Sequence, residues 1–272
     1  MSGIFNIAYA INDGFVNPTC VSIFSLLKNN KKYNIYINII YSSLSEENIR
    51  KIRMMEDFFS NVKFHFHKID EGRFLGLKLP VKHITVEMYF RYILPEILPS
   101  LNSVLYLDGD TIINGDISKL FFEDISGYCC AGVPDFMNMS VEYKRSLGIK
   151  GFYINSGVIL FNLSEIRKSN IVDYLFAISN ERDLKFPDQD AINIVFDGKI
   201  KELDIIYNFK HSHQKIFSKK FKNAKIVHYI GTNKPWKKFS FSAWRWLWYK
   251  YFILSLFQNF MVKKENIIKQ IG

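Results

Sequence analysis

The stretch "VLYLDGDTII", residues 104–113, places Asp108 and Asp110 directly after an apolar run. The apolar residues predict a buried strand, and the two aspartates come where that strand ends. Side chains at positions i and i+2 of an extended segment point the same way, so both carboxylates can bind one hard cation, Mn²⁺ or Mg²⁺. Gly109 between them lets a phosphate approach the backbone closely. An ordinary Asp-Gly turn is the alternative, but the apolar lead-in favours a metal site.

The residues around this stretch predict an α/β fold. Strands are predicted at 5–10, 33–42, 62–70 and 103–107, and helices at 18–30, 45–59 and 85–98. Strands that alternate with helices imply a mixed, mostly parallel sheet flanked by helices. In such sheets ligands bind at the carboxyl ends of the strands, where Asp108 and Asp110 would lie. No repeat or linker interrupts residues 1–238, which we take as one domain.

The composition is that of a folded protein in a reducing compartment. The 272 residues are 48% hydrophobic and 23% charged, which suits a globular chain with a large core. The number of cysteines is odd, and Cys129 and Cys130 are adjacent, which does not suit a disulfide framework. We see no signal peptide, and no segment has the roughly 20 consecutive apolar residues of a membrane span. These features predict a cytoplasmic protein.

Residues 239–272 form a tail of different character. From Lys201 onward the chain has 15 Lys/Arg and three Asp/Glu, and "WRWLWYKY" at 244–251 is densely aromatic. A basic, aromatic helix suits the surface of an anionic membrane, and we expect peripheral membrane association. One alternative is a helix that docks on the preceding domain. A nucleic-acid stacking surface is a further alternative that we disfavour, so we expect no nucleic-acid partner.

Two enzyme classes use a motif like that at 104–113. In phosphatases of the haloacid-dehalogenase type, apolar residues precede Asp-x-Asp-x-Thr, and Thr111 completes that pattern here. In this interpretation Asp108 accepts the phosphoryl group and Asp110 acts as acid and base. That motif normally opens its domain, however, whereas here strands and helices precede it.

A second stretch, "IVHYIGTNKPW" at 226–236, favours the other class. A nitrogen of His228 can complete a metal site with two carboxylates, and Lys234 can meet a diphosphate as a point charge. The stretch resembles glycosyltransferase family 8, whose pattern is His-Tyr-x-Gly-x-x-Lys-Pro-Trp. Nothing in the phosphatase class calls for this string.

Four further segments resemble the same family, in the family's order. They are "IAYAINDGF" (7–15), "HITVEMYFRYILPEIL" (83–98), "YINSGVILFNL" (153–163) and "FPDQDAIN" (186–193). The resemblance implies a GT-A-like fold and a UDP-sugar donor. It implies as donor-binding residues Ala10, Asn12, Arg91, Asp108, Gly109, Asn155, Ser156, Asp188, Gln189, Gly231 and Lys234. Asn12 stands where many relatives have an aspartate that contacts uracil.

The resemblance also implies a reaction. A galactose or glucose would pass from the UDP-sugar, with retention of configuration, to a hydroxyl of a cell-envelope glycan such as lipopolysaccharide core. Its metal ligands would be Asp108, Asp110 and His228. Gln189 matches the family residue opposite the leaving group, and Asp190 is the fallback nucleophile. Asp135 and His83 are assigned to the acceptor side, His83 close to the donor phosphates. The phosphatase remains the alternative function.

Overall fold

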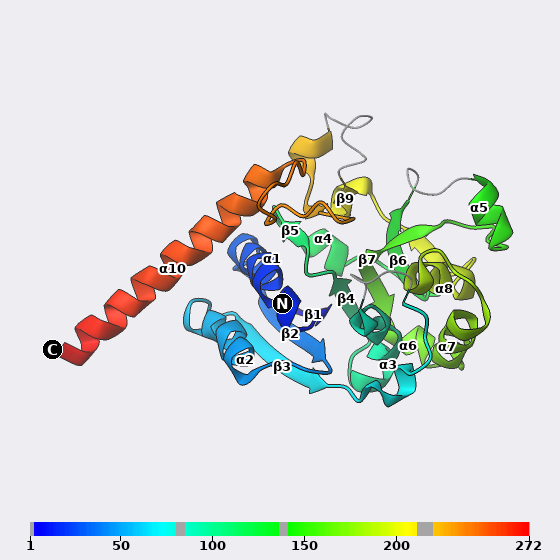
Figure 1. The fold of residues 1–272 in the computed structure, drawn as a ribbon, viewed down its shortest axis with the longest axis horizontal. Helices are drawn as coiled ribbons and strands as arrows, with labels where there is room; N and C mark the ends of the chain where they lie inside the picture. The colour runs from blue at the N-terminus through cyan, green and yellow to red at the C-terminus, as the bar shows by residue number, and fades with distance from the viewer. Residues whose placement is uncertain (1–2, 80–84, 136–140, 211–219, 272) are drawn as a thin grey trace.

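The structure of the protein, a computed structural model, describes residues 3–79, 85–135, 141–210 and 220–271. Within these residues, seven strands form one central sheet in the spatial order β3-β2-β1-β4-β7-β6-β8. They are β1 (Ile4–Ala10), β2 (Asn34–Tyr41), β3 (Val62–Lys68), β4 (Ser103–Leu107), β6 (Cys130–Pro134), β7 (Ile154–Asn162) and β8 (Ile200–Glu202). Strand β7 is antiparallel to both its neighbours, and the other pairs are parallel. The predicted mixed, mostly parallel sheet is confirmed (Figure 1).

Helices cover both faces of this sheet, which explains why its central strands β1, β4 and β7 are buried at most positions. In β1, Ile7 lies in one apolar cluster and its neighbour Ala8 in another. The first cluster includes residues of α1 (Val16–Asn29) and α2 (Glu46–Arg53). The second includes residues of η4 (Val86–Ile93), α3 (Leu94–Ile97), α6 (Leu163–Ile166), α7 (Ile171–Glu181) and α8 (Pro187–Val195).

Shorter elements connect the helices and strands. They are η1 (Asp13–Phe15), η2 (Met54–Asp57), η3 (Glu71–Phe74), α4 (Ser118–Phe121), α5 (Val141–Ser146), η5 (Ile205–Tyr207) and η7 (Lys220–Asn223). Ser45 caps α2 by accepting a hydrogen bond from the backbone N–H of Asn48 at 3.4 Å, as its position before two glutamates predicts.

The segment 85–98 differs from the single α-helix predicted to end near Pro95. Residues 86–93 form the 3₁₀-helix η4, and the short α3 follows with Pro95 in its first turn. Proline lacks an N–H, which no residue of a first helical turn needs, so Pro95 begins a helix here and does not end one. Within η4, Tyr89, Phe90, Arg91 and Tyr92 are all buried.

A second, small sheet brings the two sequence motifs together. It consists of β5 (Thr111–Ile113), β10 (Ile226–His228) and β9 (Phe209–Lys210), in the order β5-β10-β9. Strand β10 pairs antiparallel with β5, and His228 lies opposite Thr111 in the register. The histidine of the second motif is thereby placed beside the aspartates of the first.

The basic tail forms α10 (Arg245–Ile271), whose first turns dock on α1. Leu247, Trp248 and Tyr251 are buried in the first apolar cluster. The hydroxyl of Tyr251 accepts a hydrogen bond from Asn29 Nδ2 at 2.8 Å and donates one to Asn114 Oδ1 at 3.1 Å. Beyond these turns the helix extends away from the sheet and its helices (Figure 1). In the part of the chain described here, no helix combines the length and apolar content that a membrane crossing requires.

We expect Tyr251→Phe to lower the free energy of unfolding by about 1 kcal/mol, because the ring stays and only the buried hydroxyl's hydrogen bonds are lost. Urea denaturation followed by circular dichroism measures this change. Tyr174→Phe is the control, since Tyr174 on α7 is 63% exposed and should unfold like the unaltered protein. Equal midpoints for the two variants would contradict the docking of α10 through Tyr251.

Candidate functional site

The turn Asp108-Gly109-Asp110 joins β4 to β5 and is held from two sides. The carbonyl of Asp108 accepts hydrogen bonds from the backbone N–H and the hydroxyl of Thr111, at 3.2 and 2.9 Å. The N–H of Asp108 donates to the carbonyl of Gly157 on β7 at 2.8 Å. A Cβ at Gly109 would lie 2.2 Å from the hydroxyl of Thr19 on α1. Close packing against α1 therefore requires a glycine between the two aspartates.

Thr111 continues a buried row of hydroxyls into the core. Its hydroxyl lies 2.9 Å from that of Ser22 on α1, which lies 3.1 Å from that of Tyr9 on β1. These hydroxyls satisfy one another away from water, as buried polar groups must. Thr111 thus supports the turn, and its hydroxyl is committed to Ser22 and the Asp108 carbonyl.

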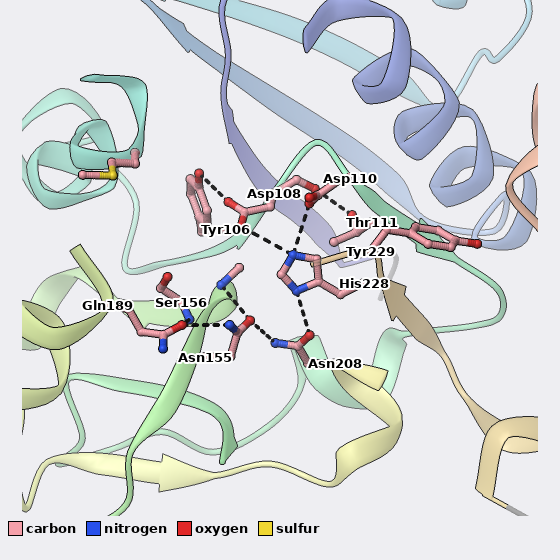
Figure 2. Close-up of polar contacts among 12 residues, drawn as sticks. Tyr106, Asp108, Asp110, Thr111, Asn155, Ser156, Gln189, Asn208, His228 and Tyr229 are labelled. Carbon is pink, nitrogen blue, oxygen red and sulfur yellow. Dashed lines mark hydrogen bonds and ion pairs between the residues drawn. The ribbon is translucent and has the colours of Figure 1, made fainter. Parts of the chain in front are cut away.

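Asp108, Asp110 and His228 converge on one point (Figure 2). One ligand atom from each lies within 4.8 Å of the others. His228 Nε2 is 3.6 Å from Asp108 Oδ2 and 3.1 Å from Asp110 Oδ1. The buried Asp110 Oδ1 accepts no well-formed hydrogen bond. An orphaned carboxylate oxygen, a second carboxylate and an imidazole nitrogen fit a divalent metal ion such as Mn²⁺ or Mg²⁺.

Lys234 lies against Asp110, as Arg91 lies against Asp108. The ammonium of Lys234 forms an ion pair with Asp110 Oδ2 and donates to the Tyr229 carbonyl at 2.7 Å. Burial alone would raise the pKa of Asp110, but the ammonium of Lys234 and the adjacent His228 ring outweigh that effect and hold the pKa well below its ordinary value. Asp110 is therefore ionised at neutral pH and available as a ligand.

Arg91 joins the two halves of the site. One guanidinium nitrogen lies 3.0 Å from Asp108 Oδ1, and another lies 3.4 Å from Asp188 Oδ2. The same group donates to the Ser156 carbonyl and stacks on the Tyr106 ring at 4.2 Å. Although burial alone lowers the pKa of Arg91, the surrounding tyrosine and carboxylates raise it above the ordinary value, so the charge is retained.

The residues of β7 and α8 that were predicted to bind the sugar donor are hydrogen-bonded to one another. Gln189 Oε1 accepts hydrogen bonds from Asn155 Nδ2 at 2.8 Å and from the Ser156 N–H at 3.0 Å. The hydroxyl of Ser156 donates to Asp188 Oδ2 at 3.0 Å. Because Arg91 contacts both Asp188 and Asp108, the structure places this cluster beside the three candidate metal ligands.

Asp190 and Asp135 face the interior. Asp190 is fully buried, and its carboxylate accepts hydrogen bonds from the Tyr153 and Tyr143 hydroxyls at 2.5 and 2.6 Å. Asp135 is 2% exposed and forms a buried ion pair with Lys210. In this structure neither carboxylate has free surface to offer a sugar.

Of the remaining predicted site residues, Ala10, Asn12 and Gly231 are described by the structure and His83 is not. Ala10 ends β1, and Asn12 just beyond it donates to the Thr85 hydroxyl at 3.2 Å. Gly231 is exposed and has a φ of +75°, a conformation that favours glycine. His83 falls outside the described residues.

Comparison with known proteins decides the class of the site. The model of "Glycosyl transferase family 8" matches residues 6–240. The chain belongs to glycosyltransferase family 8. The family resemblance inferred from the sequence motifs is therefore confirmed, and membership supports a transferase in preference to a phosphatase.

Two curated relatives of this family 8 glycosyltransferase have named activities. It is 27% identical over 255 residues to the lipopolysaccharide 1,2-glucosyltransferase of Escherichia coli (strain K12), covering 88% of this chain and 75% of that one. It is 30% identical over 255 residues to glycosyltransferase GlyF of Streptococcus pneumoniae, covering 90% and 61%.

Its fold resembles that of the galactosyltransferase LgtC, solved in complex with donor and acceptor sugar analogs. The TM-score is 0.80 at 22% identity, covering 91% of this chain and 95% of LgtC. The predicted GT-A-like fold is confirmed by this match and by the sheet.

Sequence reasoning missed several residues of this family 8 site. Tyr106 donates to Asp108 Oδ1 at 3.0 Å, and it stands two residues before Asp108 in a strand, so its side chain points the same way. That periodicity could have revealed it. Asn208, which contacts His228, follows a 3₁₀ turn far from either motif, and no local pattern marks it.

Gly157→Ala should weaken Mn²⁺ binding to this glycosyltransferase about tenfold or more, an effect of the size seen when support of a ligand is lost. A Cβ at Gly157 would lie 2.2 Å from His228 Cε1 and 2.5 Å from Asp108 Oδ2, so two ligands would have to move. Electron paramagnetic resonance of free Mn²⁺ measures the affinity. The control is Gly72→Ala, whose Cβ would make only ordinary contact at 3.4 Å. Unchanged Mn²⁺ affinity in Gly157→Ala would exclude this cluster as the metal site.

Proposed function

We propose that the chain is a retaining, metal-dependent hexosyltransferase that moves galactose or glucose from a UDP-sugar to a hydroxyl of a cell-envelope glycan. The observation that carries this proposal is the convergence of Asp108, Asp110 and His228, with Arg91 and Lys234 against them. A nucleotide-sugar diphosphate needs such a combination of a divalent ion and fixed positive charge.

The reaction breaks the bond between the anomeric carbon and the diphosphate, and it leaves negative charge on the departing oxygen. A bound Mn²⁺ or Mg²⁺ supplies Lewis-acid stabilisation of that charge. Lys234, which is paired with Asp110, would supply positive charge to the diphosphate beside a metal ion held by Asp108, Asp110 and His228. The backbone N–H of the exposed Gly231 adds a further donor near the same strand end.

Retention of configuration requires stabilisation on the sugar face opposite the leaving group. Gln189 is the residue that we assign there, with Asn155, Ser156 and Asp188 holding the donor sugar. An amide is a poor nucleophile, which favours front-side attack through an oxocarbenium-like transition state over a covalent intermediate. The complete burial of Asp190 supports a positioning role and argues against attack by its carboxylate.

The phosphatase alternative requires Asp108 to attack phosphorus. Here Asp108 Oδ1 is held by Arg91 and Tyr106, while Oδ2 faces His228. That environment favours a ligand over a nucleophile. The lipopolysaccharide glucosyltransferase among the relatives supports an envelope glycan as acceptor.

Activity assays with Mn²⁺ separate the two functions. We expect UDP release from UDP-glucose or UDP-galactose, increased by envelope glycan acceptors, and no cleavage of p-nitrophenyl phosphate. His228→Ala should lower kcat/KM about a hundredfold, because a ligand is lost that only the transferase needs. His67→Ala is the matched control, since this half-buried histidine lies on β3 and bonds Asn38. Phosphatase activity without UDP release would overturn the proposal.

The tail supports attachment to the inner face of the cytoplasmic membrane, with residues 1–238 as the nucleotide-sugar-binding catalytic domain and 239–272 as the membrane-associated part. Trp246, Lys250, Ile253 and Phe257 follow one another at helical spacing and are all exposed. They lie opposite the docked face of Leu247, Trp248 and Tyr251. The loop before α10 exposes Phe239 and Phe241 beside Lys237 and Lys238. Apolar side chains interleaved with lysines suit an anionic lipid surface.

Vesicle co-sedimentation tests this attachment. We expect binding to vesicles that contain phosphatidylglycerol, weaker binding in high salt, and little binding to phosphatidylcholine alone. Replacing Trp246 and Phe257 with glutamate should abolish binding and leave UDP release in detergent-free solution intact. Equal changes at the exposed Phe122 and Tyr174, which lie outside residues 239–272, provide the control. Binding that is indifferent to the tail variants would contradict the proposal.

A further inference from the structure

A continuous row of buried side chains connects the candidate metal ligand His228 to Asp190. His228 Nδ1 lies 3.0 Å from Asn208 Oδ1, and Asn208 Nδ2 lies 2.9 Å from Asn155 Oδ1 (Figure 2). Asn155 then meets Gln189 at 2.8 Å, and Gln189 Nε2 meets the Tyr153 hydroxyl at 3.0 Å. The hydroxyl of Tyr153 donates to Asp190 at 2.5 Å.

Groups that can only donate determine the orientation of each amide in this row. The Ser156 N–H points at the oxygen of Gln189, so Gln189 directs its nitrogen at Tyr153. The Gly157 N–H lies 3.2 Å from Asn155 Oδ1, so Asn155 directs its nitrogen at Gln189. Every hydrogen bond in the row therefore donates toward Asp190.

The same logic determines the state of the histidine. Asn155 Oδ1 can only accept, so the side chain of Asn208 turns its nitrogen toward Asn155 and its oxygen toward His228. His228 Nδ1 must then carry the hydrogen, and the other ring nitrogen, Nε2, faces Asp108 and Asp110. Metal-binding histidines generally donate their second N–H to an oxygen in this way.

Asn208 is the one member of the row that contacts both halves of the site. It is fully buried, and it lies between the strand that carries His228 and the strand that carries Asn155. We propose that Asn208 is a positioning residue, which presents His228 Nε2 to the metal ion and holds Asn155 on Gln189. This inference rests on the metal-dependent transfer proposed above.

Two substitutions of Asn208 separate its contacts. Asn208→Ala removes both, so Mn²⁺ binding without nucleotide should weaken about ten- to a hundredfold, and kcat should fall. Asn208→Asp still accepts from His228 Nδ1–H, so Mn²⁺ affinity should stay close to that of the unaltered protein. Its second oxygen repels Asn155 Oδ1, however, so kcat at saturating Mn²⁺ should fall about tenfold or more.

Asn38→Ala is the matched control. Asn38 is also a buried asparagine, which bonds a histidine, His67, at 2.9 Å and the Ile7 carbonyl at 3.1 Å, on strands away from the metal cluster. This variant should keep Mn²⁺ affinity and kcat. Electron paramagnetic resonance of Mn²⁺ and initial rates of UDP release are the two readouts.

Two results would overturn the role of Asn208: unaltered Mn²⁺ affinity in Asn208→Ala, or an equal loss of Mn²⁺ affinity in both Asn208 variants. Absence of Mn²⁺ binding by the unaltered protein would overturn the proposed metal site itself. Nitrogen NMR of His228 in the unaltered, Mg²⁺-loaded protein tests the row without substitution. We expect a hydrogen on Nδ1, and a lone pair there would contradict the proposal.

Discussion

The closeness of two carboxylates to one imidazole nitrogen is the constraint on which this structure depends. Asp108 and Asp110 repel each other, and their partial burial removes the water that would screen that repulsion. Arg91 forms an ion pair with Asp108, and Lys234 forms one with Asp110, so both carboxylates are stabilised. Two carboxylates this close are stable only when cationic side chains lie beside them, and Arg91 and Lys234 take those positions.

Two glycines, which have no side chain, leave the space that these three residues occupy. Gly109 leaves room for Thr19 on α1, and Gly157 leaves room for the His228 ring. The register of β5 and β10 then places His228 opposite Thr111. The same contacts therefore determine the packing of the core and the positions of the candidate metal ligands, since α1 packs against the Asp108–Asp110 turn and the buried hydroxyls of Ser22 and Tyr9 support Thr111.

Much of this could be predicted from sequence, because the relevant signals are local or belong to a family pattern. Apolar runs that alternate with helical periodicity indicate the sheet, and the order of Asp108, Asp110, His228 and Lys234 indicates the chemistry. Pro95 misled the prediction because proline both ends helices and begins them.

Apart from Tyr106, the supporting residues could not be predicted, because they act through contacts between distant segments. Asn208 and His228 are 20 positions apart, and Tyr153 meets Asp190 across 37. Burial likewise depends on the whole fold, and it assigns Asp190 and Asp135 to interior hydrogen bonds that their exposed-looking sequence contexts do not reveal.

The reversed direction of β7 has a consequence for how such sites tolerate change. The strands around it deliver their ligand-facing residues after their apolar runs, whereas β7 delivers Asn155 and Ser156 at its beginning. A one-residue insertion just after Ser156 would turn Asn155 and Ser156, which are neighbours in the strand, each to the face of the sheet opposite its present one. The candidate site therefore depends on the register of β7 where the chain enters this edge as well as on the turn where β4 leaves it.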